Sequence, residues 1–326
     1  MANKRCCDKK ILQCRFKFAI IYLRDSSDGR VRMAKKKTLK DLTLKDNFMF
    51  GAVMSDEENC RRLLELILQI PIDRIAVSKE KTIIYNPECK GVRLDVYAKD
   101  EKNTHYNVEM QAVLKSALEK RTRYYHSQID MELLLSGADY SELPDTYVIF
   151  ICDFDLFGKG KYCYTFEQRC NEDDSLSLQD GSRSIFLNTH GQNADEVPRE
   201  LVKFLEFVKA DLTDSMKDYE DAFVESLQKS IQKIKETRKW EEHFMGWYDV
   251  MEDEKAEARA EGRAEGKAEG KAEGKAELLV EILEDTGEIP ESVRKRIMSE
   301  TDLSLLGRWC KLAIKSKSVD QFIKEM

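Results

Sequence analysis

Two acidic side chains, Asp95 and Glu109, lie on the two strands of a predicted β-hairpin. Apolar and polar residues alternate through residues 92–100 and again through residues 104–111, which is the pattern of half-buried strands. A three-residue loop with Asn103 in the left-handed conformation would join them in a common type of hairpin. Because apolar faces must match, this register sets Asp95 directly across from Glu109.

Carboxylates in such a pair need a partner between them. Directly opposed residues have Cβ atoms about 4.5–5.5 Å apart, so two carboxylates there repel unless a proton or a cation separates them. Mg²⁺ is the simplest solution, with Mn²⁺ or Ca²⁺ as alternatives, and such an ion polarises a phosphodiester and activates a bound water. The spacing alone leaves a second interpretation open, in which Asp95 pairs with Arg93 or Lys99 as ordinary solvated strand charges.

The segments around the hairpin predict an α/β fold. Apolar residues recur at helical spacing from Asp46 to Leu68 and at a spacing of two from Ala76 to Gln111, which indicates helices and then three strands. A helical pattern from Ala112 to about Leu135 leads to an apolar run, Thr146–Cys152, that is typical of a buried strand. Two further strand-like segments, which extend the sheet or form a side hairpin, cover residues 161–167 and 183–188.

This order, with Asp on the second strand and Glu-x-Gln on the third, resembles the PD-(D/E)XK nuclease fold. More narrowly, the chain resembles the PD-(D/E)XK family transposases, also called recombination-promoting nucleases, over residues 38–326. The segments that carry the resemblance are Thr43–Phe50, Arg93–Val96, Asn107–Gln111, Arg123–Tyr125, Val148–Asp155, the Glu-Gly-x-Ala repeat and Leu305–Phe322. The resemblance implies a restriction-endonuclease-like αβββαβ core, with a mixed sheet flanked by helices, and an α-helical C-terminal region. It also implies a metal-dependent endonuclease that acts on DNA.

The resemblance further assigns roles to single residues. Asp95 and Glu109 become the metal-binding carboxylates, and the backbone carbonyl of Met110 completes the set of metal ligands. Gln111 joins the catalytic residues at the position where the superfamily pattern has Lys. A neutral amide can orient a water or a phosphate oxygen, but it brings no charge and no titratable amine, so activation of the nucleophile falls to the metal.

Two sets of neighbouring residues are further candidates. The predicted helix after the hairpin carries the candidate DNA-binding side chains Lys115, Arg121, Arg123 and Tyr125. An alternative interpretation makes this set a charged outer face. The first helices carry three acids, any of which could assist the metal: Asp46, Glu58 and Glu65.

Composition excludes several other classes of protein. The nine cysteines include no CxxC pair and the four histidines no HExxH, so disulfide scaffolds, zinc ribbons and zinc hydrolases are not indicated. No apolar run approaches the ~18 residues that span a bilayer, so no membrane contact is expected. Cysteines without a disulfide framework make the cytoplasm the expected location. Residues 1–40 hold 13 Lys or Arg and 3 Asp or Glu, so the rest of a chain of net charge −7 carries −17. DNA contacts must therefore come from local patches or from the N-terminal arm.

Composition also predicts five segments. They are a basic extension over residues 1–34, a nuclease-like domain over 35–190, a helical region over 191–250, an Ala-Glu-Gly-Lys repeat helix over 251–279 and a helical region over 280–326. The extension is either a mis-called start before a natural initiator at Met33 or a disordered basic arm. The repeat is either a solvated linker helix or a small-residue stripe for close helix pairing. The second interpretation supports an alternative function, in which catalysis is weak or lost and the C-terminal helices mediate self-association into a homo-oligomer.

Overall fold

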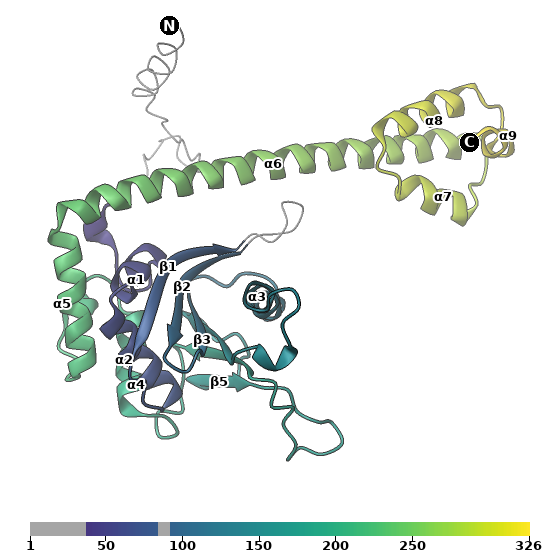
Figure 1. The fold of residues 1–326 in the computed structure, drawn as a ribbon. Helices are drawn as coiled ribbons and strands as arrows, with labels where there is room; N and C mark the ends of the chain where they lie inside the picture. Colours follow the sequence, from purple (N-terminus) through teal and green to yellow (C-terminus); the bar gives the residue numbers. More distant parts are fainter. Residues whose placement is uncertain (1–36, 84–91) are drawn as a thin grey trace, which may run out of the picture. The chain divides into compact units, whose positions relative to one another are not determined.

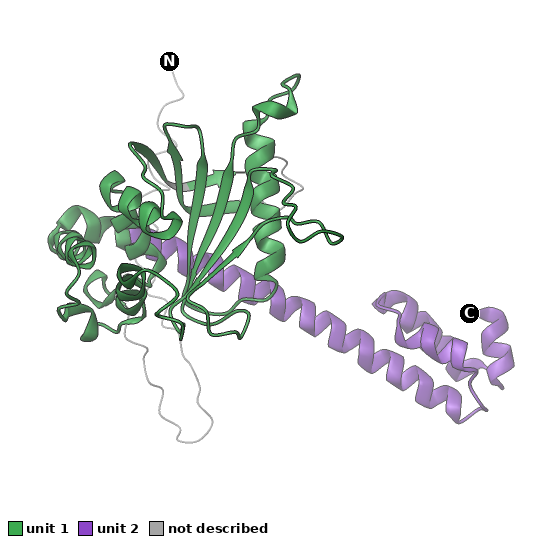
Figure 2. Ribbon diagram, turned by 90° about the horizontal axis from the view of Figure 1, so that it is seen from below, with its two compact units in different colours: residues 1–244 green, residues 245–326 purple. Residues whose placement is uncertain are grey.

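The computed structural model describes residues 37–83 and 92–326. The extension predicted for residues 1–34, including Met33, lies outside the described residues. The chain forms two compact units that divide after Phe244 (Figure 2).

The first unit is built on a six-stranded mixed sheet with the order β1-β2-β3-β4-β6-β5. The strands are β1 (Ile75–Ile83), β2 (Val92–Asp100), β3 (His105–Gln111), β4 (Thr146–Cys152), β5 (Cys163–Phe166) and β6 (Ser182–Asn188). β1, β2 and β3 pair antiparallel, β3, β4 and β6 pair parallel, and β5 returns antiparallel to β6. The predicted order of elements is confirmed, and the two late strands extend the sheet.

Helices cover both faces of this sheet (Figure 1). The helices of the first unit are α1 (Asn47–Met54), α2 (Glu57–Leu68), α3 (Leu118–Leu133), α4 (Arg199–Lys209), α5 (Ala222–Glu236) and the first residues of α6 (Arg238–Glu284). Short 3₁₀ turns occupy Leu39–Asp41, Tyr140–Glu142 and Asp214–Met216. α3 lies on one face, and α1 and α2 lie on the other with α4 and α5 packed against them. Every residue of β3 is therefore buried, including its polar ones.

An aromatic cluster fixes α3 on its face of the sheet. Phe150 of β4 stacks on Tyr125 of α3, with ring centroids 6.1 Å apart and an interplanar angle of 25°. The opposite edge of the cluster is Phe186 of β6, whose ring stacks on Phe150 at 5.4 Å and 14°. Leu118 and Ile129, both buried, belong to the same cluster. Core packing thus sets the position of Tyr125, and with it the position of Arg121, one helical turn earlier.

The helix predicted to begin at Ala112 begins instead at Leu118. Residues 112–117 form an exposed loop that ends at Ala117, whose φ of +59° lies in the left-handed region. A parallel crossover requires the chain to turn back over the sheet after β3, and this loop makes that turn before the helix can start. Lys115, predicted on the helix, consequently lies in the loop.

The second unit is helical. It contains most of α6 together with α7 (Glu291–Met298), α8 (Leu303–Lys315) and α9 (Val319–Glu325). Leu279, Leu283, Trp309 and Phe322 are among the residues of its own hydrophobic core. Among the described residues, no helix combines the length and the apolar character that crossing a bilayer requires.

The glycines of the repeat lie in an exposed stretch of α6, and their substitution tests which interpretation of the repeat holds. A Cβ built on Gly262, Gly266 or Gly270 meets no described atom within 4 Å. Replacing all three by Ala should therefore stabilise this helix by about 1 kcal/mol per site. Hydrogen exchange of the α6 amides would report the gain as slower exchange. Faster exchange, or the loss of an oligomer seen by light scattering, would instead favour close helix pairing through the glycines.

Candidate metal centre

The β2–β3 hairpin has the predicted register. Val96 lies opposite Val108, and Asn103 in the connecting loop has a φ of +66°. Backbone pairing between the two strands ends at Val96 and Val108, so Asp95 and Glu109 lie one position beyond the last paired residues. The prediction that loop geometry and matched faces bring the two carboxylates together is confirmed.

Beyond this point, hydrogen bonds from backbone N–H groups to side-chain carboxylates take the place of backbone–backbone pairing between β2 and β3. The backbone N–H of Asp95 donates to Glu109 Oε1 at 3.2 Å, and the N–H of Met110 donates to Asp95 Oδ2 at 3.2 Å. Asn47 Nδ2 donates to the same Oδ2, also at 3.2 Å. Because the N–H and the C=O of one residue point to the same side of a strand, the Met110 carbonyl also faces β2. The hydrogen bonds leave Asp95 Oδ1 and Glu109 Oε2 as the oxygens without a backbone donor.

Burial disfavours the simultaneous ionisation of the two carboxyl groups. Glu109 is fully buried and Asp95 is partly buried. Burial raises the pKa of Glu109 to about 8, and the charge of Asp95 adds to that rise. Burial likewise raises the pKa of Asp95 to about 6, although the hydrogen bond from the Met110 N–H opposes the shift. The pair therefore gains stability from any cation that comes between or beside its oxygens.

One cation already lies beside the pair. Arg121, in the first turn of α3, contacts Glu109 Oε2 through a guanidinium nitrogen at 2.9 Å. A second guanidinium nitrogen lies 3.5 Å from Gln111 Oε1, and Nε donates to the Tyr125 hydroxyl at 2.6 Å. The guanidinium carbon is 4.8 Å from the centroid of the Tyr125 ring. The sequence predicts Arg121 as a DNA-binding residue and gives no sign of this contact with Glu109.

The donor atoms fit a hard divalent cation. Two carboxylates and a backbone carbonyl offer oxygen only, and Mg²⁺ is typically held by one or two carboxylates while it keeps several waters. Across residues 37–83 and 92–326, no group of three or more His, Cys, Asp or Glu is placed to hold a metal. Fully buried Asn107, two residues before Glu109 on the same face of β3, has an amide with no hydrogen bond of ordinary geometry among the described residues, yet it is close enough to the Glu109 carboxyl to oppose the rise of its pKa. Buried amides held this loosely often lie beside a water or an ion.

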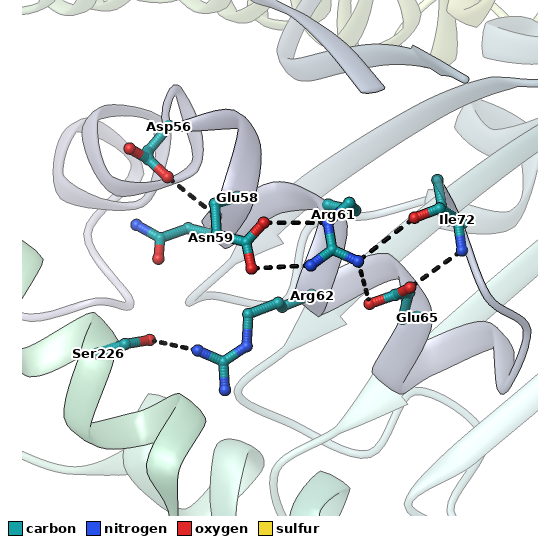
Figure 3. Close-up of polar contacts among 8 residues, drawn as sticks. All are labelled: Asp56, Glu58, Asn59, Arg61, Arg62, Glu65, Ile72 and Ser226. Carbon is teal, nitrogen blue, oxygen red and sulfur yellow. Dashed lines mark hydrogen bonds and ion pairs between the residues drawn. The ribbon is translucent and has the colours of Figure 1, made fainter. Parts of the chain in front are cut away.

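Two of the three candidate acids of the first helices form ion pairs with one arginine (Figure 3). Arg61 contacts Glu58 and Glu65, each at 2.8 Å, on the exposed side of α2. Glu65 also accepts from the backbone N–H of Ile72 at 3.0 Å, which anchors the loop that leads to β1. Both acids therefore have structural partners within their own segment.

The third acid, Asp46, contacts Lys37 at 2.6 Å and accepts from the backbone N–H of Thr43. The next residue, Asn47, is the one that reaches Asp95. The sequence gives no signal for Asn47, because no spacing rule identifies a contact between residues 48 positions apart. The start of α1 thus contributes an amide to the site instead of an acid.

The remaining predicted residues fall into two groups. Gln111 and Tyr125 are both buried, and both contact Arg121. Lys115 and Arg123 are exposed. Arg123 lines a cavity of about 490 Å³ between α3 and the first residues of β4 and β6, and neither Asp95 nor Glu109 lines this cavity.

Comparison with known families places this architecture. The family model described as PD-(D/E)XK nuclease family transposase matches residues 44–264, which include the whole sheet and both carboxylates. No curated protein and no solved structure matches the chain. Since the match covers well over half of the sequence, the chain belongs to the PD-(D/E)XK nuclease family transposases.

Proposed function

We propose that the protein is a metal-dependent DNA endonuclease that hydrolyses phosphodiester bonds in recombination or in the life of a mobile element. The observation that carries the proposal is the contact of Asp95 and Glu109 where β2 and β3 stop pairing. The pair carries up to two negative charges, whereas Arg121 brings one positive charge and contacts Glu109, so a further cation is favoured at the two carboxylates. Membership of a nuclease-type transposase family supplies DNA as the substrate class.

The residues of the site have distinct parts in this proposal. Asp95 Oδ1, Glu109 Oε2 and the Met110 carbonyl would hold the cation, and the N–H groups of Asp95 and Met110 fix the two carboxylates by the hydrogen bonds to their other oxygens. Bound there, Mg²⁺ would polarise the scissile phosphodiester and lower the pKa of a coordinated water. Gln111, buried beside the pair, would orient that water or a phosphate oxygen through its amide.

The substrate needs contacts away from the carboxylates, because an acidic body repels a polyanion. Lys115 is an exposed cation in the loop directly after β3. We propose that this loop contacts the DNA backbone next to the cleaved bond. Arg123 would add a second contact with DNA from α3, on the face of that helix that lines the cavity.

A plasmid assay tests the proposed activity. Purified protein is incubated with supercoiled plasmid in Mg²⁺, in Mn²⁺ and in EDTA, and Asp95→Ala protein prepared in the same way serves as the control for contaminating nucleases. Nicked circles are expected only with wild-type protein and a metal. Nicking that is equal in the two preparations, or that persists in EDTA, would contradict the proposal.

A further inference from the structure

We propose that Arg121 and the divalent cation compete for Glu109, so that metal binding releases Arg121 to contact a phosphate of the substrate. This inference rests on the proposed function, because it presupposes a metal at the carboxylate pair. It assigns Arg121 a positioning role: a counter-ion in the metal-free protein and a phosphate contact once the metal is bound.

The competition follows from which oxygens are already engaged. Glu109 Oε1 accepts from the backbone N–H of Asp95, and this bond joins two strands of the rigid sheet. Oε2 is therefore the oxygen that Glu109 can offer to a metal, and it is the oxygen that Arg121 contacts at 2.9 Å. A guanidinium and a divalent cation repel each other strongly at such short range in a partly desolvated site. One of the two has to leave Oε2.

Arg121 is the partner that is able to move. Its side chain is 30% exposed, whereas that of Glu109 is 0% exposed. Tyr125 gives the guanidinium a second anchor, through the 2.6 Å hydrogen bond from Nε and through the ring face. Tyr125 itself is held by its stacking on Phe150. Arg121 can thus leave Glu109 while it stays next to the site, where a planar guanidinium suits a phosphate group.

Calorimetric titration with Ca²⁺ tests the competition without turnover. Titrations at about pH 8.5, where protons compete least for the carboxylates, compare wild type with Arg121→Gln and with Lys120→Gln. Lys120, the exposed preceding residue of α3, is the control for loss of one nearby charge. Arg121→Gln should bind Ca²⁺ at least about fivefold more tightly than Lys120→Gln, and Arg121→Lys should fall between them. Equal or weaker binding by Arg121→Gln would overturn the inference.

Wild-type protein separates the two levels of failure. If wild type binds no divalent cation at all, the proposed metal-dependent function fails and the competition fails with it. If wild type binds Ca²⁺ and Arg121→Gln binds no more tightly than Lys120→Gln, only the role of Arg121 is wrong. Should Arg121→Gln not fold, the ¹⁵N–¹H signal of the Arg121 η nitrogen that contacts Glu109 in wild type serves instead. That signal should shift as Ca²⁺ is added, and an unchanged signal would contradict the release.

DNA binding tests the second half of the exchange. In Ca²⁺, Arg121→Gln should lower the affinity for a duplex by about fivefold, because one phosphate contact is lost. In EDTA, where Arg121 stays on Glu109, the same substitution should leave the affinity unchanged. A loss of equal size under both conditions would show that Arg121 contacts DNA whether or not metal is bound, which would refute the exchange.

Discussion

Replacing Asp95 by Asn, or Glu109 by Gln, is expected to slow metal-dependent plasmid nicking by about 10²–10³-fold. Each change keeps the size of the side chain and removes one of the two negative charges that would hold the cation. The strand pairing that ends at Val96 and Val108 does not depend on those charges, so the sheet should persist. Initial rates of conversion of supercoiled plasmid to nicked circles, with circular dichroism as a check on folding, give the measurement.

The double variant and a surface control sharpen this test. Asp95→Asn with Glu109→Gln should be no slower than the worse single variant by more than about tenfold, because both residues serve one ion. Asp73→Asn, an exposed acid just before β1, should change the rate by less than about twofold. Fully multiplicative losses in the double variant would indicate that the two carboxylates act independently and would argue against a shared cation.

The affinity of the site for a divalent cation should rise steeply with pH. Metal ligands must be deprotonated, and burial raises the pKa of Asp95 to about 6 and that of Glu109 to about 8. For every pH unit below the pKa of Glu109, about tenfold in affinity is lost to the competing proton. Titration calorimetry with Mn²⁺ between pH 6 and pH 9 should therefore show tighter binding at each step, with a plateau near the upper end.

The stability of the metal-free protein should change in the opposite sense. The raised pKa of Glu109 in the folded state favours its protonated form, which stabilises the folded protein. This stabilisation is complete below the unfolded-state pKa of about 4.5 and is lost as the pH rises through the folded-state pKa. Glu109→Gln removes the titration, so the difference in unfolding free energy between wild type and this variant should shift in favour of the variant from pH 5 to pH 9. A difference that does not change with pH would contradict the raised pKa.

The strands and their register could be predicted because local signals determine them. Alternating residues identified β2 and β3, and the need for matching apolar faces left few registers open. Asn103 supplied the turn geometry that chose among them, and its φ of +66° agrees. The burial of β4 followed from the unbroken apolar run Thr146–Cys152.

Contacts between segments far apart in the chain could not be predicted from the sequence. Val113 and Leu114 continue a helical pattern, but they are 70% and 60% exposed in the loop before α3, and periodicity cannot separate such a loop from a first helical turn. A helical wheel also leaves the rotation of α3 against the sheet undetermined. That rotation, set by the packing of Tyr125 on Phe150, is what brings Arg121 to Glu109.

The short hairpin loop before β3 carries an evolutionary constraint of its own. Inserting or deleting one residue next to Asn103 would shift the β2–β3 register by one, which turns every side chain of β3 to the other face of the sheet relative to β2. Asp95 would then face an apolar residue, even though both acids remained in the sequence. Among natural variants of this chain, length changes should therefore be as rare in this loop as substitutions of the two acids, while the exposed repeat of α6 tolerates gain or loss of whole four-residue units.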